Sequence, residues 1–426
     1  MDSNRLRRVI IDEWFPIMEV SVESIRERSA SSALPPLYFL HVWFARRPLV
    51  ASRAAVLAGL LPPDFDKREL LKLLGIPPDK DVKAAAERLA RAKASGERLR
   101  ENPFTWPRAY TQTPSKEALE KLREIFRSYW GKDAPVLLDP MAGGGSIPFE
   151  ALRLGLPVIA GELNPVAYVI LKATLEYPLR FRERLIEAVR DFCMRVHEEA
   201  KKELEEFFPK KEGELVYAYL WARTIRCPTC GLYIPMSPNW WIVRSKTDAK
   251  NIAVKPIPPP RGEGDYCSFE IIHAPKMHGF DPDEGTDIGK EARCPRCGTI
   301  IDGETVKREA QNGRMGHQLY VVATKTLTSG RSSWKFRVPT KKELEAVKNA
   351  EKRLGEKLSY WMDKRLPPFE NFPVDAADTR PIQYGMSRWM DLFNPRQLLT
   401  HLTYLEKIIQ AKEELLSKAK TEEEKE

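Results

Sequence analysis

LLDPMAGGGSIPFEALRLGLPVIAGELNP, residues 137–165, contains two short apolar runs separated by a glycine-rich turn and a helical pattern. The run 136–138 suits a strand that is buried on both faces of a parallel sheet. The three glycines 143–145 allow positive φ and the close approach of a ligand to the backbone. Pro148 fits the first turn of a helix, and residues 156–161 predict a second strand. The stretch therefore predicts a β-α-β unit with a ligand site at its strand ends.

Acidic residues follow both predicted strands, Asp139 after the first and Glu162 after the second. A dinucleotide fingerprint aligned on Gly143 and Gly145 would place Pro148 where a third small residue is needed, so NAD and FAD fit poorly. S-adenosylmethionine (SAM) has no pyrophosphate, and its ammonium group and ribose hydroxyls suit two carboxylates. The residues favour SAM, with Asp139 at its amino-acid end and Glu162 at its ribose. An ordinary glycine-rich turn is the structural alternative.

The same stretch resembles the SAM-binding motif of amino-group DNA methyltransferases. More narrowly, it is similar to the family of adenine-specific DNA methylases that contain a zinc ribbon, through the pattern D-P-x-A-G-G-G-S-x-x-x-E-A-x-R-L-G followed by Asn164-Pro165. The family usually has Asp where this chain has Glu162. The resemblance implies an α/β fold with part of a Rossmann-like SAM-dependent methyltransferase sheet, an inserted zinc ribbon and added helices. The cofactor contacts that it implies are Asp139, Pro140, Met141, Ala142, Gly143, Gly144, Gly145, Ser146, Glu162, Leu163 and Asn164.

A second block of resemblance lies near the N-terminus. Residues 37–49 read LYFLHVWFARRPL, and the family has a closely similar L-H-x-W-[FW]-A-R-R-P-L pattern. By analogy this segment would close over the methionine end of SAM, with Trp43, Ala45, Arg46 and Arg47 nearest. The two arginines could instead contact phosphates or cap a helix.

Four of the six cysteines form two knuckles, CPTCG with Cys227 and Cys230, and CPRCG with Cys294 and Cys297. Each knuckle spaces two thiolates for neighbouring corners of a tetrahedron, so the pair predicts a structural zinc ribbon. Residues 231–293 separate the knuckles, and we expect an insertion there. Its aromatic and basic residues could contact DNA or could form strands that pack on a sheet. Of the remaining cysteines, we expect Cys193 to be a buried thiol in a helix.

Methylation of the adenine amino group needs a [DNS]-P-P-[YFW] loop that accepts hydrogen bonds from the amine and stacks on the flipped base. In the resembled family this loop lies beyond a P-R-Q-L segment, which residues 384–398 match here with YGMSRWMDLFNPRQL. Two partial matches occur: LPPF (366–369) lacks the polar residue, and SPNW (237–240) lacks the second proline. We therefore expect a partner subunit to supply the D-P-P-Y loop and the rest of the sheet.

Length and composition agree with a multidomain globular protein, since the chain has 426 residues and 42% hydrophobic residues. A formal charge of +9 favours a polyanionic partner, although a heavily charged solvated surface would look the same. No apolar run suggests a membrane span or a signal peptide, so we expect a cytoplasmic protein. The predicted regions are a cofactor-closing segment (1–60), a helical insertion (61–115), the methyltransferase core (116–215), the ribbon (216–310), a strand with C-terminal helices (311–415) and a charged tail (416–426).

These observations predict the SAM-binding subunit of a heteromeric N6-adenine DNA methyltransferase that acts on double-stranded DNA, in a restriction-modification or defence system. Two alternatives stay open. One is a complete methyltransferase for RNA or protein that uses a partial match to the catalytic loop. The other is a zinc-ribbon nucleic-acid-binding protein whose methyltransferase fold is inactive or regulatory.

Overall fold

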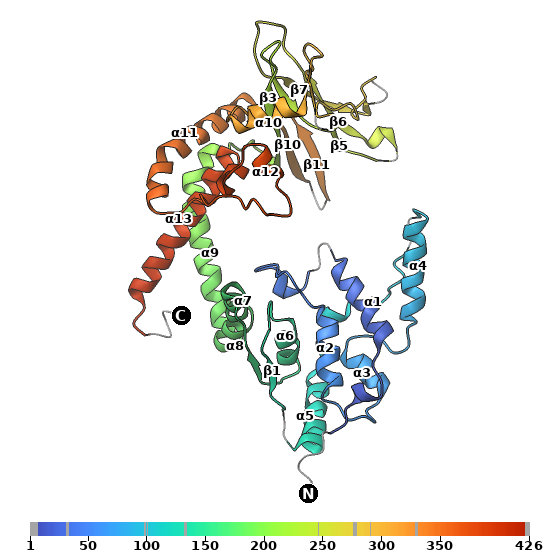
Figure 1. The fold of residues 1–426 in the computed structure, drawn as a ribbon. Coiled ribbons are helices and arrows are strands. Elements are labelled where there is room, and N and C mark those ends of the chain that lie inside the picture. The colour runs from blue at the N-terminus through green and yellow to red at the C-terminus, as the bar shows by residue number, and fades with distance from the viewer. Residues whose placement is uncertain are drawn as a thin grey trace. The chain divides into compact units, whose positions relative to one another are not determined.

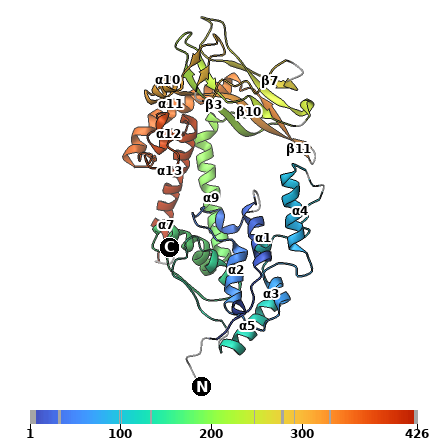
Figure 2. The ribbon, with the colours of Figure 1, turned by 45° about the vertical axis from the view of Figure 1, so that its right-hand side comes forward.

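A computed structural model of the protein describes residues 7–30, 34–97, 99, 101–131, 134–245, 247–275, 279–289, 291–328 and 331–421. The chain forms two compact units, residues 1–189 and 190–426 (Figures 1 and 2). The boundary falls inside helix α9, Glu183–Leu204. Within the described ranges, no helix is both long and apolar enough to cross a membrane.

The first unit begins with helices that bury one apolar core. Asp66, Asp81 and Ser115 accept hydrogen bonds from backbone N–H groups at the starts of α3, α4 and α5, which explains where these helices begin. The core lies between α2 and its neighbours, and Leu57 of α2 is fully buried in it. The helices are α1 (Ile17–Arg28), α2 (Leu49–Ala58), α3 (Lys67–Leu73), α4 (Val82–Ala94) and α5 (Lys116–Trp130).

The predicted β-α-β unit follows α5. Strand β1 (Leu137–Asp139), helix α6 (Ser146–Arg153) and strand β2 (Val158–Ala160) are in the expected order, and the two strands pair in parallel. Among the described residues this sheet has only these two strands. The chain then continues through α7 (Pro165–Leu171), one π-helical turn (Lys172–Glu176) and α8 (Tyr177–Phe181).

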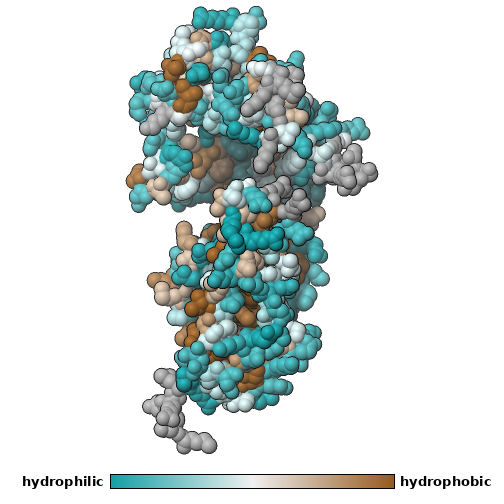
Figure 3. All heavy atoms as spheres, turned by 90° about the vertical axis from the view of Figure 1, so that its right-hand side faces the viewer, coloured by the Kyte–Doolittle hydropathy of each residue, from teal (hydrophilic) through white to brown (hydrophobic). Residues whose placement is uncertain are grey.

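The prediction that the first strand is buried on both faces was wrong. Leu137 and Val158 pack on the core of the first unit, but Leu138 and Ile159, which pair with each other on the opposite face, are 65% and 59% exposed. Parallel sheets are normally covered on both faces, and no further strand of the described chain extends this one. In the view of Figure 3, hydrophobic residues (brown) interrupt the hydrophilic surface of the first unit.

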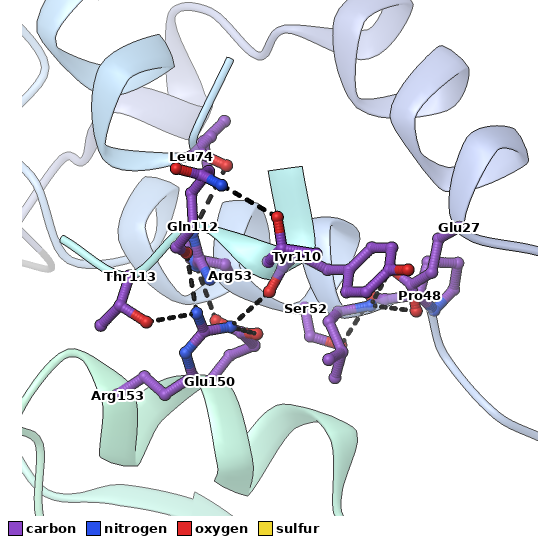
Figure 4. A network of polar contacts seen from close by, with 12 residues as sticks. Glu27, Pro48, Ser52, Arg53, Leu74, Tyr110, Gln112, Thr113, Glu150 and Arg153 are labelled. Carbon is purple, nitrogen blue, oxygen red and sulfur yellow. Dashed lines mark hydrogen bonds and ion pairs between the residues drawn. The ribbon is translucent and has the colours of Figure 1, made fainter. Parts of the chain in front are cut away.

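A buried ion network fixes α6 to the N-terminal helices (Figure 4). Arg53 of α2 donates to the Glu150 carboxylate of α6 over 2.6 Å, and both side chains are almost fully buried. Arg153 donates to the same carboxylate over 2.8 Å and to the Tyr110 carbonyl over 3.0 Å. Burial lowers the pKa of the Arg153 guanidinium, although the nearby carboxylate favours its charged form. The network therefore holds the helix that follows the glycine-rich turn.

The second unit contains two antiparallel sheets that share a core. A four-stranded sheet has the order β11-β10-β3-β4, and a three-stranded sheet has the order β5-β6-β7. Trp240, Val254 and Val321 are buried between the two sheets. The strands are β3 (Leu215–Arg226), β4 (Tyr233–Met236), β5 (Trp241–Val243), β6 (Ile252–Ile257), β7 (Ser268–His273), β8 (Ala292–Arg293), β9 (Ile300–Ile301), β10 (Gly316–Thr328) and β11 (Arg331–Arg337).

Helices cover part of the four-stranded sheet and form a second core in this unit. At the start of α13, Asn394 and Gln397 form a capping box. The guanidinium of Arg396 lies 4.0 Å from the ring centroid of Tyr219 on β3. Cys193 on α9 is exposed, so its prediction as a buried thiol was wrong. The helices are the second half of α9, α10 (Gly303–Gln311), α11 (Lys341–Asp363), α12 (Arg380–Gln383) and α13 (Pro395–Lys418).

Candidate functional site

The turns after β1 and β2 are joined by backbone hydrogen bonds at the carboxyl edge of the small sheet. The N–H of Gly161 donates to the Asp139 carbonyl over 2.8 Å, and the N–H of Ala142 donates to the Gly161 carbonyl over 3.0 Å. The glycine loop, residues 142–146, needs glycine for its conformation, because φ is +52° at Gly143 and +79° at Gly145. The sequence thus brings both strand ends and the loop together.

Glu162 reaches across this edge and holds the glycine loop. One carboxylate oxygen accepts the N–H of Gly143 over 2.7 Å, and the other accepts the N–H groups of Leu163 and Asn164 over 2.9 and 3.1 Å. These backbone donors, led by Asn164, lower the pKa of Glu162, so its carboxylate stays ionised. Among the described residues, the oxygen bonded to Gly143 has this one donor, so it keeps a lone pair for another donor such as a hydroxyl group.

Asp139 lies on the same edge, and among the described residues its carboxylate accepts one long hydrogen bond, 3.3 Å from the N–H of Met141. Met141 and Leu163, which follow the two acids closely, are almost fully exposed. Ala142 and Ser146 are buried, so these two loop positions are covered at this edge. The edge therefore offers two carboxylates, backbone groups and apolar side chains in one place.

Trp43 of the N-terminal segment lies directly on the glycine loop. A Cβ atom added to Gly143 would lie 2.8 Å from Trp43 Nε1, and one added to Gly144 would lie 2.9 Å from Trp43 Cβ. Side chains at these two positions would displace the indole ring. The structure thus places the tryptophan of the resembled aromatic segment at the predicted loop, while Ala45 is exposed to solvent.

Arg46 stacks on an aromatic ring of its own segment. Its guanidinium stacks 3.8 Å from the ring centroid of Tyr38, whose hydroxyl donates to the buried Glu27 carboxylate over 3.0 Å. Glu27 also accepts the N–H of Leu49, the first residue of α2, over 2.9 Å. Burial is the main cause that raises the pKa of Glu27. Glu27 therefore anchors the segment that carries Trp43, and the sequence analysis missed this role.

The cavity beside β2 does not include the acidic edge. It has a volume of about 260 Å³ and is mostly apolar, with the Lys172–Glu176 ion pair (2.7 Å) at its wall. Its lining residues include Val158 and Ala160 of β2 and Leu152 of α6, but neither Asp139 nor Glu162.

The four knuckle cysteines converge in the second unit. Their sulfur atoms all lie within 4.8 Å of one another, and two of the separations are 3.5 Å for Cys230–Cys294 and 3.7 Å for Cys227–Cys297. A tetrahedral zinc site with Zn–S bonds of about 2.3 Å needs sulfur atoms about 3.8 Å apart. The cluster is therefore compatible with a zinc ion, as the two knuckles predicted.

The turns of the knuckles are alike. Gly231 and Gly298, which follow the second cysteine of each knuckle, have φ of +76° and +73°. Their N–H groups each donate over 2.9 Å to the carbonyl of the first cysteine, Cys227 or Cys294. The predicted insertion between the knuckles contains the sheet β5-β6-β7, and three of its six Phe, Tyr and Trp residues lie in strands.

Neither partial match to the catalytic loop presents a free aromatic ring. Trp240 of SPNW is buried in the core between the two sheets. Phe369 of LPPF packs on the helical core of the second unit. The Trp240 ring is therefore covered, whereas Phe369 is half-buried.

Comparison with known proteins gives one match. A family model described as "Protein of unknown function (DUF1156)" matches residues 14–91. This range spans α1, the aromatic segment, α2, α3 and most of α4. No curated protein and no solved structure matches the chain. The match therefore falls on the helices that place Trp43 over the glycine loop.

Proposed function

We propose that this chain is the SAM-binding subunit of a heteromeric N6-adenine DNA methyltransferase. The observation that carries the proposal is the shared edge of β1 and β2, where Asp139 and Glu162 flank a glycine loop. Asp139 would hold the ammonium group of SAM and Glu162 its ribose hydroxyls. Both residues retain acceptor capacity for these donors. Bound SAM would supply a methyl group on a sulfonium.

Other residues of the edge have supporting roles in this proposal. The N–H groups of the glycine loop and the ring of Trp43 would enclose the methionine end, and Leu163 would cover the adenine ring. The four cysteines would hold a structural zinc ion, because four thiolates leave no open position for catalysis.

The incomplete sheet supports the requirement for a second subunit. β1 pairs on one side only, and the face that carries Leu138 and Ile159 is open to solvent. An unpaired strand edge and an exposed apolar face are liabilities that proteins normally cover. We propose that the partner extends this sheet and supplies the D-P-P-Y loop that accepts the flipped adenine.

The test is a calorimetric titration of SAM into the chain alone and into the chain with a candidate D-P-P-Y subunit, combined with methyl transfer to DNA adenine. We expect SAM binding by this chain and activity only with the partner. Asp139→Asn and Gly143→Ala should weaken SAM binding, the second because its Cβ would displace Trp43. Cys193→Ser is the control. Absence of SAM binding in both states, with the metal retained, would leave a zinc-ribbon nucleic-acid-binding protein as the better description.

A further inference from the structure

The strands β3, β10 and β11 carry no acidic residue. Their sequences are LVYAYLWARTIR, GHQLYVVATKTLT and RSSWKFR, which contain six Lys and Arg residues and six aromatic residues, not counting histidine. The strands are neighbours in one antiparallel sheet, in the order β11-β10-β3 (Figure 1). Aromatic rings interleaved with positive charge on an open sheet are typical of surfaces that bind unpaired bases.

Tyr217 reaches this surface because of a β-bulge. Ala323 pairs with Ala218, but Thr324 pairs with Val216, so Tyr217 is left without a partner residue on β10. Bulges re-aim side chains in this way. The Tyr217 ring lies edge-on to Trp334 of β11, with 4.6 Å between the ring centroids. Two strands that do not pair with each other thus contribute to one aromatic cluster.

The ammonium group of Lys325 on β10 lies over both rings. Its ammonium nitrogen is 4.3 Å from the ring centroid of Tyr217 and 4.5 Å from that of Trp334. No carboxylate within the described part of the chain is in ion-pair distance of this nitrogen, whereas the neighbouring Arg337 is paired with Glu214 and Glu343 over 2.9 and 2.7 Å. Lys325 is therefore available to a phosphate.

The cluster is solvent-exposed but firmly supported. Tyr217 is 61% exposed and Trp334 is 47% exposed. Phe336 lies with its ring nearly parallel to that of Trp334, at 6°, and packs into the core between the two sheets. By contrast, Tyr219 and Trp221 further along β3 are covered by the guanidinium of Arg396. Large aromatic side chains left open beside covered ones mark a binding surface.

We propose that Tyr217, Lys325 and Trp334 form a stacking platform that binds unpaired bases of a single-stranded nucleic acid. A base stacks on the open ring surface and replaces the ammonium group there, and Lys325 turns to the adjacent phosphate. The platform assigns nucleic-acid contact to the unit that bears the cysteine cluster. Binding by this platform does not depend on SAM or on a partner subunit. The platform can therefore be tested separately from the proposed function.

The test is fluorescence anisotropy of the full chain, without SAM, with labelled oligonucleotides of about 12 nucleotides, within the usual footprint of such sites. The probes are oligo-dT, oligo-rU and a DNA duplex. The variants are Tyr217→Ala, Trp334→Ala, Trp334→Phe and Lys325→Gln. Tyr360→Ala is the matched control, because Tyr360 on α11 is 51% exposed and also has a lysine, Lys364, 6.0 Å from its ring centroid. Circular dichroism and metal content establish that each variant is folded.

We expect Tyr217→Ala and Trp334→Ala to weaken oligo-dT binding about 5- to 150-fold each, the range for loss of one stacked base. Trp334→Phe should retain most of the affinity, and Tyr360→Ala should behave as wild type. Lys325→Gln should reduce the salt dependence by about one phosphate contact. Tighter binding of oligo-rU would support the platform and identify RNA as its ligand. The proposal is overturned if the folded wild type binds no single strand, or if Trp334→Ala and Tyr360→Ala weaken binding equally.

Discussion

In residues 190–426 the two sheets cover each other and helices cover part of the outer face, whereas β1 and β2 in residues 1–189 leave one apolar face open. The first arrangement is antiparallel and is built from hairpins, with a four-cysteine cluster that closes the two knuckles. The second is parallel, and a parallel sheet needs crossover connections that the described chain supplies only once. The comparison separates a region whose sheets are covered by its own chain from one whose small sheet has an exposed apolar face.

Removal of one metal ligand should have the largest effect on stability, and it should destabilise the second unit alone. Cys294→Ser leaves three thiolates, so we expect loss of the bound metal and of several kcal/mol of folding free energy; small zinc peptides gain roughly 10–16 kcal/mol from the metal. Metal analysis and calorimetry measure both effects. Cys193→Ser, at an exposed thiol, should retain the metal. One metal ion per chain in Cys294→Ser would contradict the four-thiolate site.

The second-largest loss of stability is expected in the first unit. Glu150→Gln removes the carboxylate that faces the buried Arg53 guanidinium, and breaking a buried ion pair in this way costs about 3–5 kcal/mol. Chemical denaturation followed by circular dichroism measures the change. Glu198→Gln is the control, since the Glu198–Lys201 pair is exposed and should contribute less than about 1 kcal/mol. Equal losses in the two variants would show that burial of the Arg53–Glu150 pair is not what matters.

The free energy of unfolding should depend on pH through a residue of the covered four-stranded sheet. Burial, with a smaller contribution from Arg223, lowers the pKa of His317 on β10 to about 4. Between pH 6.5 and 4 the unfolded chain binds a proton that the native chain does not, so the free energy of unfolding falls as the pH falls, by about 3 kcal/mol at most. His317→Gln should flatten this dependence. Urea unfolding of the wild type and of His317→Gln across that pH range measures the dependence. Any release of metal at low pH affects both proteins alike and does not account for a difference between them. If the free energy of unfolding has the same pH dependence in both proteins, His317 is not its cause.

The smallest effect on stability is expected at the open face of the first unit. Leu138→Lys places a charge on a side chain that is already largely exposed, so the free energy of unfolding should change by less than about 0.5 kcal/mol. Association with a D-P-P-Y subunit should nevertheless be lost, because a lysine ammonium cannot be buried in an apolar interface without a partner. Gel filtration of the mixture measures it. Val374→Lys, at another exposed apolar residue, should still associate. Association of Leu138→Lys would place the interface elsewhere.

Local patterns predicted much of the architecture. The glycine loop, α6 with Pro148 in its first turn and the two parallel strands follow from residue types at short range, and so do the two cysteine knuckles. The error at Leu138 has a different origin. An apolar run indicates a strand, but whether both faces are covered depends on strands that are far away in sequence or on another chain. The prediction that Cys193 is buried was wrong for the same reason, since an amphipathic pattern does not show which face of a helix packs against another element.

Other features could not be predicted because they depend on register and on tertiary contacts. The bulge that turns Tyr217 toward Trp334 arises from the pairing of β3 with β10, more than 100 residues apart in sequence. The role of Glu27 as an anchor for Tyr38 and Leu49 likewise needs the packing of α1 on α2. A signal for Glu27 was present in principle, because an acid on the inward face of an amphipathic helix requires a donor.

Glu162 has a consequence for recognition as well as for structure. Its carboxylate joins Gly143 to the turn after β2, so the conformation of the glycine loop is already fixed in the folded chain before a ligand binds. A ligand that arrives at this edge meets a preorganised loop, and less of its binding energy is consumed in restricting the chain. An aspartate has a side chain one methylene shorter than glutamate. Glu162→Asp is therefore a graded way to loosen the loop while its charge is retained.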